Sequence, residues 1–204
     1  MIGIIDYGMG NIRSVLNAVE MVGGKADICT DPNTLSNYEQ LILPGVGAFP
    51  MGIKNLQNRG FVEPLTKRVI VDKIPILGIC LGMQLMAARG TEGVNCDGLN
   101  WIDATVEIIN KSNQNLKIPH VGWNDIEYNP GCSLFRQLPP HPDMYFVHSY
   151  HMVCKNPSIR IAQCQYKNAT ISAAIQNNTI WGTQFHPEKS QEFGLKILEN
   201  FLLE

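Results

Sequence analysis

The stretch Gly78-Ile79-Cys80-Leu81-Gly82-Met83-Gln84 follows the apolar run Ile74-Pro75-Ile76-Leu77 and leads into Leu85-Met86-Ala87-Ala88. A buried strand, a glycine-flanked turn and a helix are typical of a nucleophile elbow, in which a strained turn carries the nucleophile. We therefore expect Cys80 at the apex of the turn, with its thiol presented to solvent. The start of the following helix favours the thiolate, and the Leu81 N–H is a candidate oxyanion donor.

A base for this thiol is predicted near the C-terminus. Gln184-Phe185-His186-Pro187-Glu188 comes directly after the apolar strand candidate at 179–183. Pro187 restricts His186 to extended conformations, and in extended backbone alternate side chains lie on one side, so Glu188 can orient the imidazole. The sequence thus predicts a catalytic triad of Cys80, His186 and Glu188.

A third motif, Leu41-Ile42-Leu43-Pro44-Gly45-Val46-Gly47, reads as an apolar strand that runs into a glycine-rich turn. The backbone amides of such a turn can complete an oxyanion hole, and the Val46 N–H is the candidate donor. Each motif has a structural alternative when it stands alone: a buried inert cysteine, a core histidine, an ordinary turn. Glycines on both sides of Cys80 are not explained by burial, and they favour the functional interpretation.

Together these motifs resemble the class I (triad) glutamine amidotransferases, and the resemblance extends over essentially the whole chain. It implies that L-glutamine is the substrate. Gln84 would contact the bound glutamine, Gly47 would border the same pocket, and the segment His148-Ser149-Tyr150 would help to hold the substrate, with Ser149 and Tyr150 as contacts.

Three further segments, 6–14, 119–124 and 145–150, resemble the glutaminase subunits of imidazole glycerol phosphate synthases. The resemblance implies that glutamine is hydrolysed through a Cys thioester. Ammonia would pass to a (β/α)8-barrel cyclase subunit in a heterodimer, which makes imidazole glycerol phosphate and an aminoimidazole carboxamide ribotide in histidine biosynthesis. Asn11, Trp123 and Asn124 would face that partner.

The pattern of apolar runs predicts an α/β fold. Strand candidates at 1–5, 25–29, 40–43 and 74–79 alternate with helix candidates at 12–22, 61–71 and 81–88, which indicates a parallel sheet. The second half contains candidates for antiparallel strands at 101–109, 145–153, 159–166, 171–176 and 179–185, and a closing helix at 191–203. We expect a single amidotransferase domain over 1–204 with an open, mostly parallel or mixed sheet flanked by helices.

Composition excludes several other classes of protein. The net charge is −2 and no large Lys/Arg cluster occurs, so neither nucleic acid nor a membrane surface is an expected partner. The six cysteines are scattered without a C-x-x-C pair, which predicts free thiols in a reducing compartment such as the cytoplasm. His148 and His151 project to opposite faces of an expected strand, so no metal site is predicted, and no cofactor is expected.

Three alternative functions remain open at this point. Paralogues of the same subunit beside surface-polysaccharide genes look like ammonia suppliers for the amidination of a sugar, and 145–154 resembles those as well. A stand-alone cysteine hydrolase of the same fold would need only the triad. A non-catalytic binding module could keep the fold, although the complete triad and both elbow glycines argue against it.

Overall fold

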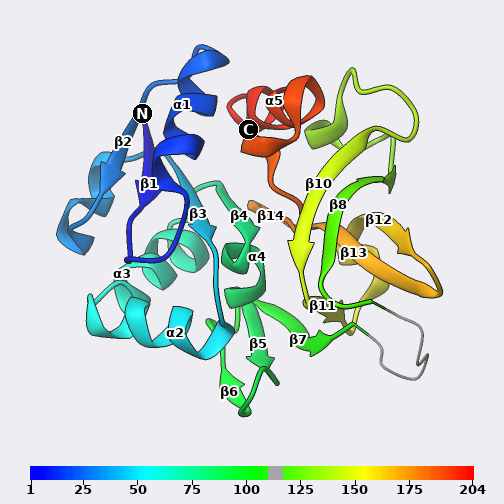
Figure 1. The fold of residues 1–204 in the computed structure, drawn as a ribbon. Helices are drawn as coiled ribbons and strands as arrows, with labels where there is room; N and C mark the ends of the chain where they lie inside the picture. The colour runs from blue at the N-terminus through cyan, green and yellow to red at the C-terminus, as the bar shows by residue number, and fades with distance from the viewer. Residues whose placement is uncertain (110–116) are drawn as a thin grey trace.

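The structure is a computed structural model, and it describes residues 1–109 and 117–204 (Figure 1). Its centre is an eight-stranded sheet with the order β2-β1-β3-β4-β14-β13-β12-β9. The first five of these strands run parallel, and the remaining neighbours pair antiparallel. The strands are β1 (Ile2–Ile5), β2 (Ala26–Cys29), β3 (Gln40–Gly45), β4 (Ile76–Cys80), β9 (Glu127–Tyr128), β12 (Arg160–Tyr166), β13 (Ala169–Asn177) and β14 (Ile180–Thr183).

Two smaller sheets lie beside the central one. The first is an antiparallel ribbon of β8 (His120–Asp125) and β10 (Asp143–His148). The second contains β11 (Tyr150–Cys154), β7 (Ile102–Ile108), β5 (Ala87–Gly90) and β6 (Cys96–Asp97) in that order. The expected fold class, a mixed α/β sheet with an antiparallel section in the second half, is confirmed.

Helices cover both faces of the central sheet (Figure 1). They are α1 (Ile12–Met21), α2 (Phe49–Asn58), α3 (Val62–Thr66) with a π-helical continuation (Lys67–Val71), α4 (Leu81–Leu85) and α5 (Gln191–Phe201); short 3-10 turns occur at Pro32–Asn37, Ser133–Phe135, Pro157–Ile159 and Pro187–Lys189. None of the helices within 1–109 and 117–204 combines the length and the apolar character that crossing a bilayer requires.

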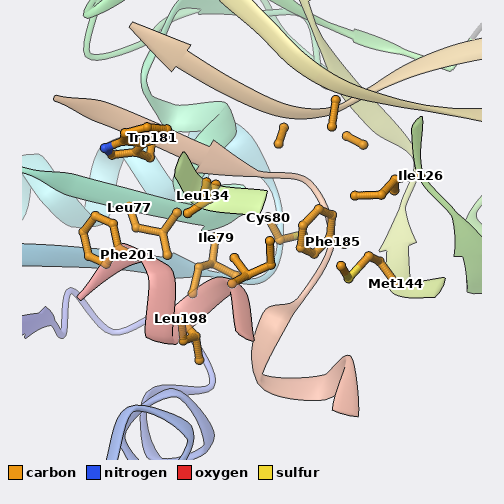
Figure 2. Packing of buried hydrophobic residues seen from close by; sticks show 14 of the residues in the cluster. Leu77, Ile79, Cys80, Ile126, Leu134, Met144, Trp181, Phe185, Leu198 and Phe201 are labelled. Atoms are coloured by element: carbon orange, nitrogen blue, oxygen red, sulfur yellow. The ribbon is translucent and has the colours of Figure 1, made fainter. Parts of the chain in front are cut away.

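Alternation along the parallel strands builds one core on each face of the sheet. In β4, Leu77 and Ile79 pack with α1 and α5, whereas Ile76 packs with α2, α3 and α4. Figure 2 shows Leu77 and Ile79 near Leu198 and Phe201 of α5. Because successive side chains point to opposite faces, a strand covered on both sides must be apolar throughout, which is why 76–80 is an uninterrupted apolar run.

Three expectations about elements were wrong. The segment 145–153 is not one strand, because the chain leaves the β8–β10 ribbon after His148 and enters another sheet at Tyr150. The helix after Cys80 ends at Leu85, and 87–90 forms β5 instead. Strand β14 pairs parallel with β4 as well as antiparallel with β13. Hydrophobic alternation alone does not specify which strand is the partner, and this explains the first and third errors.

Helix α2 was not predicted, although its sequence carries the signals for it. Proline stands in its first turn, where a missing N–H costs nothing, and the buried residues Phe49, Gly52, Ile53 and Leu56 have the spacing of one helical face. One of those four positions, Gly52, has no apolar side chain, and Leu85 packs closely against its backbone. The helix could therefore have been predicted, but only from a short apolar face that contains a glycine.

Substitution of Gly82 tests how tightly the chain packs at the end of β4. A Cβ at Gly82 would lie 1.7 Å from the Leu43 carbonyl oxygen, so the backbone of β3 or α4 must move. We expect Gly82→Ala to lower the free energy of unfolding by about 3 kcal/mol or more. Urea unfolding followed by far-UV circular dichroism measures this.

The matched control is Gly131→Ala, where the nearest atom to a Cβ is Asn129 Oδ1 at 3.3 Å. Its unfolding free energy should stay within about 0.5 kcal/mol of the parent protein. Equal stabilities of the two variants would contradict the close packing inferred for Gly82.

Candidate active site

The predicted strand, turn and helix are present at 76–85, with Cys80 at the junction. Cys80 has φ 53° and ψ −107°, a conformation that a residue with a Cβ adopts only under strain. A Cβ at Gly78 would lie 2.7 Å from the backbone nitrogen of Met83, and the one at Gly82 would collide with Leu43. The two glycines are therefore required by close backbone approach, as the sequence predicted.

Cys80 is not presented to bulk solvent, and this expectation was wrong. The residue is only 6% exposed and belongs to the buried cluster drawn in Figure 2. Its surroundings open instead into a cavity of about 450 Å³. The cavity is lined by Val46, Gly47, Cys80, Leu81, Gln84, Glu92, Pro119, Val147, His148, Ser149, Tyr150, His186 and Lys189. Among the described residues, this cavity is the opening onto the Cys80 side chain.

His186 and Glu188 form the expected pair. His186 Nδ1 lies 2.8 Å from Glu188 Oε1, and both side chains are 1% exposed. His186 has the extended conformation that Pro187 imposes (φ −98°, ψ 100°), whereas Glu188 lies on the short 3-10 turn Pro187–Lys189. The carboxylate thus reaches the imidazole from a turn, not from a continued strand.

Strand β10 fixes the backbone of the histidine. The His186 N–H donates to the Tyr145 carbonyl at 2.9 Å. Ser190 Oγ accepts from the Tyr145 N–H at 3.0 Å and donates to the His186 carbonyl at 2.6 Å. Three hydrogen bonds among Tyr145, His186 and Ser190 close a ring, so the backbone of His186 is held at both its N–H and its carbonyl.

The surroundings of His186 favour its charged form. Burial by itself lowers the pKa of the imidazole, but the neighbouring Cys80 sulfur and the Glu188 carboxylate outweigh burial and raise the pKa to about 9. His186 Nε2 is buried and makes no hydrogen bond of ordinary geometry within the described residues. Since Glu188 occupies Nδ1, Nε2 is the ring nitrogen that remains for a further partner.

Every expected oxyanion and substrate residue lies on the cavity wall. Val46 follows the end of β3 and is 40% exposed, and Gly47 has φ +109°, a value that favours glycine. Leu81 follows the nucleophile directly, at the start of α4. Gln84 lies one turn further along α4, while Ser149 and Tyr150 come from the crossing between β10 and β11. Segments distant in sequence therefore meet around one sulfur.

The chain matches a known protein family over nearly its whole length. The family model described as glutamine amidotransferase class-I matches residues 3–204. The chain belongs to this family. Among its relatives, imidazole glycerol phosphate synthase subunit HisH 1 of Campylobacter jejuni (strain RM1221) is 46% identical, over 99% of each chain. Subunit HisH 2 of Methanococcus maripaludis is 43% identical over 99% of this chain and 98% of the relative. The HisH subunit of Geobacter sulfurreducens is 44% identical over 98% and 97%.

Solved structures show the same fold at lower sequence identity. The structure of PurLQS from Thermotoga maritima aligns with a TM-score of 0.76 at 19% identity, over 99% of this chain and 97% of that one. A crystal structure described as glutamine amidotransferase gives a TM-score of 0.75 at 19% identity, over 98% of both chains. At this identity the likeness concerns the class I amidotransferase fold alone.

Sequence reasoning missed two charged residues in the cavity of this amidotransferase. Glu92 follows β5, and its Oε2 accepts from the Phe49 N–H at the start of α2 at 2.7 Å. Lys189 follows Glu188, and its Nζ lies 5.7 Å from the centre of the Tyr145 ring. The signal for Lys189 was its position directly after the triad acid. For Glu92 only a carboxylate in a glycine-rich segment was visible.

The three residues expected to face a partner lie outside the cavity. Trp123 is 48% exposed and makes an edge-to-face contact with Tyr145. Asn124, the next residue of β8, points to the opposite face, where its Nδ2 donates to the Gln165 carbonyl at 2.9 Å. Asn11 takes the N-cap position of α1, without a capping hydrogen bond from its side chain.

The charge state of His186 can be tested by removing its acid partner. In Glu188→Gln the carboxylate charge and an acceptor for the imidazolium are lost, so the pKa of His186 should fall from about 9 toward 6.5. We expect a loss of roughly 10²-fold or more in glutaminase turnover. NMR titration of the histidine ring resonances measures the pKa. Glu107→Gln, an exposed change in β7, is the control and should leave the pKa as it is; an unshifted pKa in Glu188→Gln would contradict the pairing.

Proposed function

We propose that this chain is the glutaminase subunit of an imidazole glycerol phosphate synthase and that Cys80, His186 and Glu188 are its catalytic triad. The buried thiol that faces a cavity beside a charged histidine is the observation that carries the proposal. The curated relatives, which match over nearly their full length, are named as subunits of that synthase. One amidotransferase domain accounts for 1–204, and six free cysteines fit a reducing compartment such as the cytoplasm.

In the first half-reaction the Cys80 thiolate attacks the carboxamide carbon of glutamine. The carbonyl oxygen gains negative charge, and the N–H groups of Val46 and Leu81 are the donors placed to stabilise it. The His186 imidazolium gives its proton to the departing nitrogen, so that ammonia leaves and a γ-glutamyl thioester remains. Glu188 holds the ring with Nε2 toward the sulfur throughout.

In the second half-reaction His186 acts in the opposite direction. As a neutral imidazole it takes a proton from water, and the resulting hydroxide attacks the thioester carbon. The same two N–H groups stabilise the second oxyanion. Collapse of this intermediate releases glutamate and regenerates the Cys80 thiolate beside the protonated His186.

The cavity walls fit the polar ends of glutamine. The Glu92 carboxylate lies on one wall and is a partner for the α-ammonium group. Gln84, Gly47, Ser149 and Tyr150 supply amide, hydroxyl and backbone groups on the remaining walls. A cavity of about 450 Å³ is within the size range of small-molecule sites.

The ammonia would pass to a (β/α)8-barrel cyclase subunit in a heterodimer. The exposed face of the β8–β10 ribbon is a suitable docking surface, because it presents Val121 (55% exposed), Trp123 (48%) and Val147 (36%) beside the cavity mouth. Val147 also lines the cavity. The products would be imidazole glycerol phosphate and an aminoimidazole carboxamide ribotide in histidine biosynthesis.

The comparisons favour this assignment over the alternatives. The relatives carry the synthase subunit name and match from end to end, which favours neither a supplier of ammonia for sugar amidination nor a stand-alone cysteine hydrolase. A binding module without activity is disfavoured by the strained thiol and its charged base, since neither is needed for packing.

Removal of the nucleophile separates glutaminase chemistry from the synthase reaction. In the complex of Cys80→Ala with the cyclase subunit, glutamine-supported formation of imidazole glycerol phosphate should fall by at least about 10³-fold. Formation supported by ammonium chloride should stay within about twofold, since the cyclase site is untouched. Product analysis with either nitrogen source measures both rates. Retained glutamine-dependent turnover in Cys80→Ala would contradict the assignment of Cys80 as the nucleophile.

Docking through the ribbon is tested by replacing valine with aspartate at two positions, one on the proposed surface and one outside it. Val121→Asp places a charge on the proposed surface and should raise the dissociation constant for the cyclase subunit at least about tenfold. Val153→Asp, at a comparably exposed valine of β11 (41%), should leave the constant within about twofold. Isothermal titration calorimetry measures the constants. Equal effects of the two substitutions would refute the docking surface.

We also expect low glutaminase activity without the partner and a rise in turnover when the partner binds.

A further inference from the structure

The carbonyl oxygen of Tyr150 determines the orientation of a set of buried polar side chains next to the active site. It lies 2.8 Å from His148 Nδ1 and 2.8 Å from Gln84 Nε2. A carbonyl oxygen only accepts hydrogen bonds, so both nitrogens must be donors. His148 therefore carries its proton on Nδ1, and the Gln84 amide is turned with its NH₂ group toward Tyr150.

This orientation extends from Gln84 to the nucleophile. Gln84 Nε2 also donates to Gln184 Oε1 at 3.0 Å. With its oxygen turned to Gln84, Gln184 directs its own NH₂ group at Cys80 Sγ, 3.7 Å away, which is within hydrogen-bonding range for sulfur. The Gln184 backbone is held as well, because its N–H donates to the Ala173 carbonyl at 2.8 Å.

These hydrogen bonds also extend from Tyr150 through His148 to His120 in the β8–β10 ribbon. His148 is neutral, because burial lowers its pKa to about 3, so His148 Nε2 accepts from His120 Nδ1 at 3.0 Å. Burial also lowers the pKa of His120, to about 4, and its ring stacks between Phe146 and Tyr166. One tautomer of each histidine satisfies every contact.

Water is largely excluded from these contacts. The exposed fractions are 0% for Gln184, 5% for Gln84 and 6% for His148. A hydrogen bond in such a place is difficult to replace, since a side chain that loses its partner is left unpaired. The sulfur of Cys80 is likewise buried, so donors from the protein must replace those that water would supply.

We propose that Gln184 is a further catalytic residue, which donates a hydrogen bond from its side-chain amide to the Cys80 thiolate, and that His148 is a positioning residue that holds Gln184 in this orientation through Tyr150 and Gln84. Cys80 then has a hydrogen-bond donor in addition to the groups proposed for the oxyanion. The significance for turnover rests on the proposed glutaminase function, whereas the hydrogen bond to sulfur does not.

The test measures the reactivity of the thiol directly. The full chain is treated with iodoacetamide over a range of pH, and mass spectrometry follows the modification of Cys80 separately from the five other cysteines. In Gln184→Met, which fills a similar volume without a donor, the midpoint pH for alkylation of Cys80 should rise by about one unit. Turnover of glutamine should fall about tenfold with KM within about threefold.

Thr183→Val is the matched control. Thr183 is the neighbouring residue, it is 0% exposed, and its Oγ1 has no hydrogen-bond partner within the described residues, so the change removes no contact to sulfur. Its midpoint should stay within about 0.2 units of the parent protein. An unshifted midpoint in Gln184→Met, or the same shift in both variants, would overturn the role of Gln184.

A pair of substitutions at His148 tests the positioning role. Asparagine can place a donor near the position of His148 Nδ1, whereas leucine cannot. We expect His148→Leu to shift the midpoint in the same direction as Gln184→Met and His148→Asn to restore most of the parent value. Equal midpoints for the two would overturn the positioning role, even if Gln184→Met failed to fold. Because alkylation requires neither glutamine nor a partner, these results are independent of whether the chain is a glutaminase.

Discussion

The active site depends on the parallel pairing of β4 with β3 on one side and with β14 on the other. Gly45 at the end of β3 lies opposite Cys80, and Thr183 at the end of β14 lies opposite Ile79. The chain therefore leaves all three strands at the same edge of the sheet, which is where open α/β sheets bind their ligands. Val46, Cys80 and His186 meet for this reason, although they are far apart in sequence.

Two costs at this edge are offset by the packing behind it. The strained backbone of Cys80 persists because β4 is buried along its whole length and Gly82 lies against the Leu43 carbonyl. A charge on the buried His186 is tolerated because Glu188 and Cys80 contact or face the same ring. Removing one of these partners would leave the others buried without compensation, so we regard the triad as one electrostatic unit.

The sequence predicted those parts of the site that local rules determine. Glycines on both sides of Cys80 indicated the elbow, and Pro187 indicated the extended conformation of His186. The expectation that the Cys80 thiol is exposed to solvent was wrong, because an elbow specifies backbone geometry but not the loops that cover it. The role of Gln184 was not predicted either, since its partners Gln84 and Cys80 lie in another part of the chain. Hydrogen bonds between side chains distant in sequence leave no periodic signal.

For the fold as well, the sequence pattern predicts local structure better than it predicts the pairing of distant segments. Strands β1, β3 and β4 were predicted well because each is a buried, almost continuous apolar run. The break at Ser149 was missed because β10 and β11 both alternate, and alternation is the same whichever sheet a strand joins.

The hydrogen-bonded ring of Tyr145, His186 and Ser190 has a mechanical consequence. Tyr145 is part of the ribbon whose outer face carries Trp123, and its main chain is bonded both to the His186 peptide and to the Ser190 hydroxyl. Within residues 1–109 and 117–204, strand β10 pairs with a single strand, β8. A tilt of this ribbon would therefore shift the backbone of His186, and with it the position of the imidazole beside Cys80.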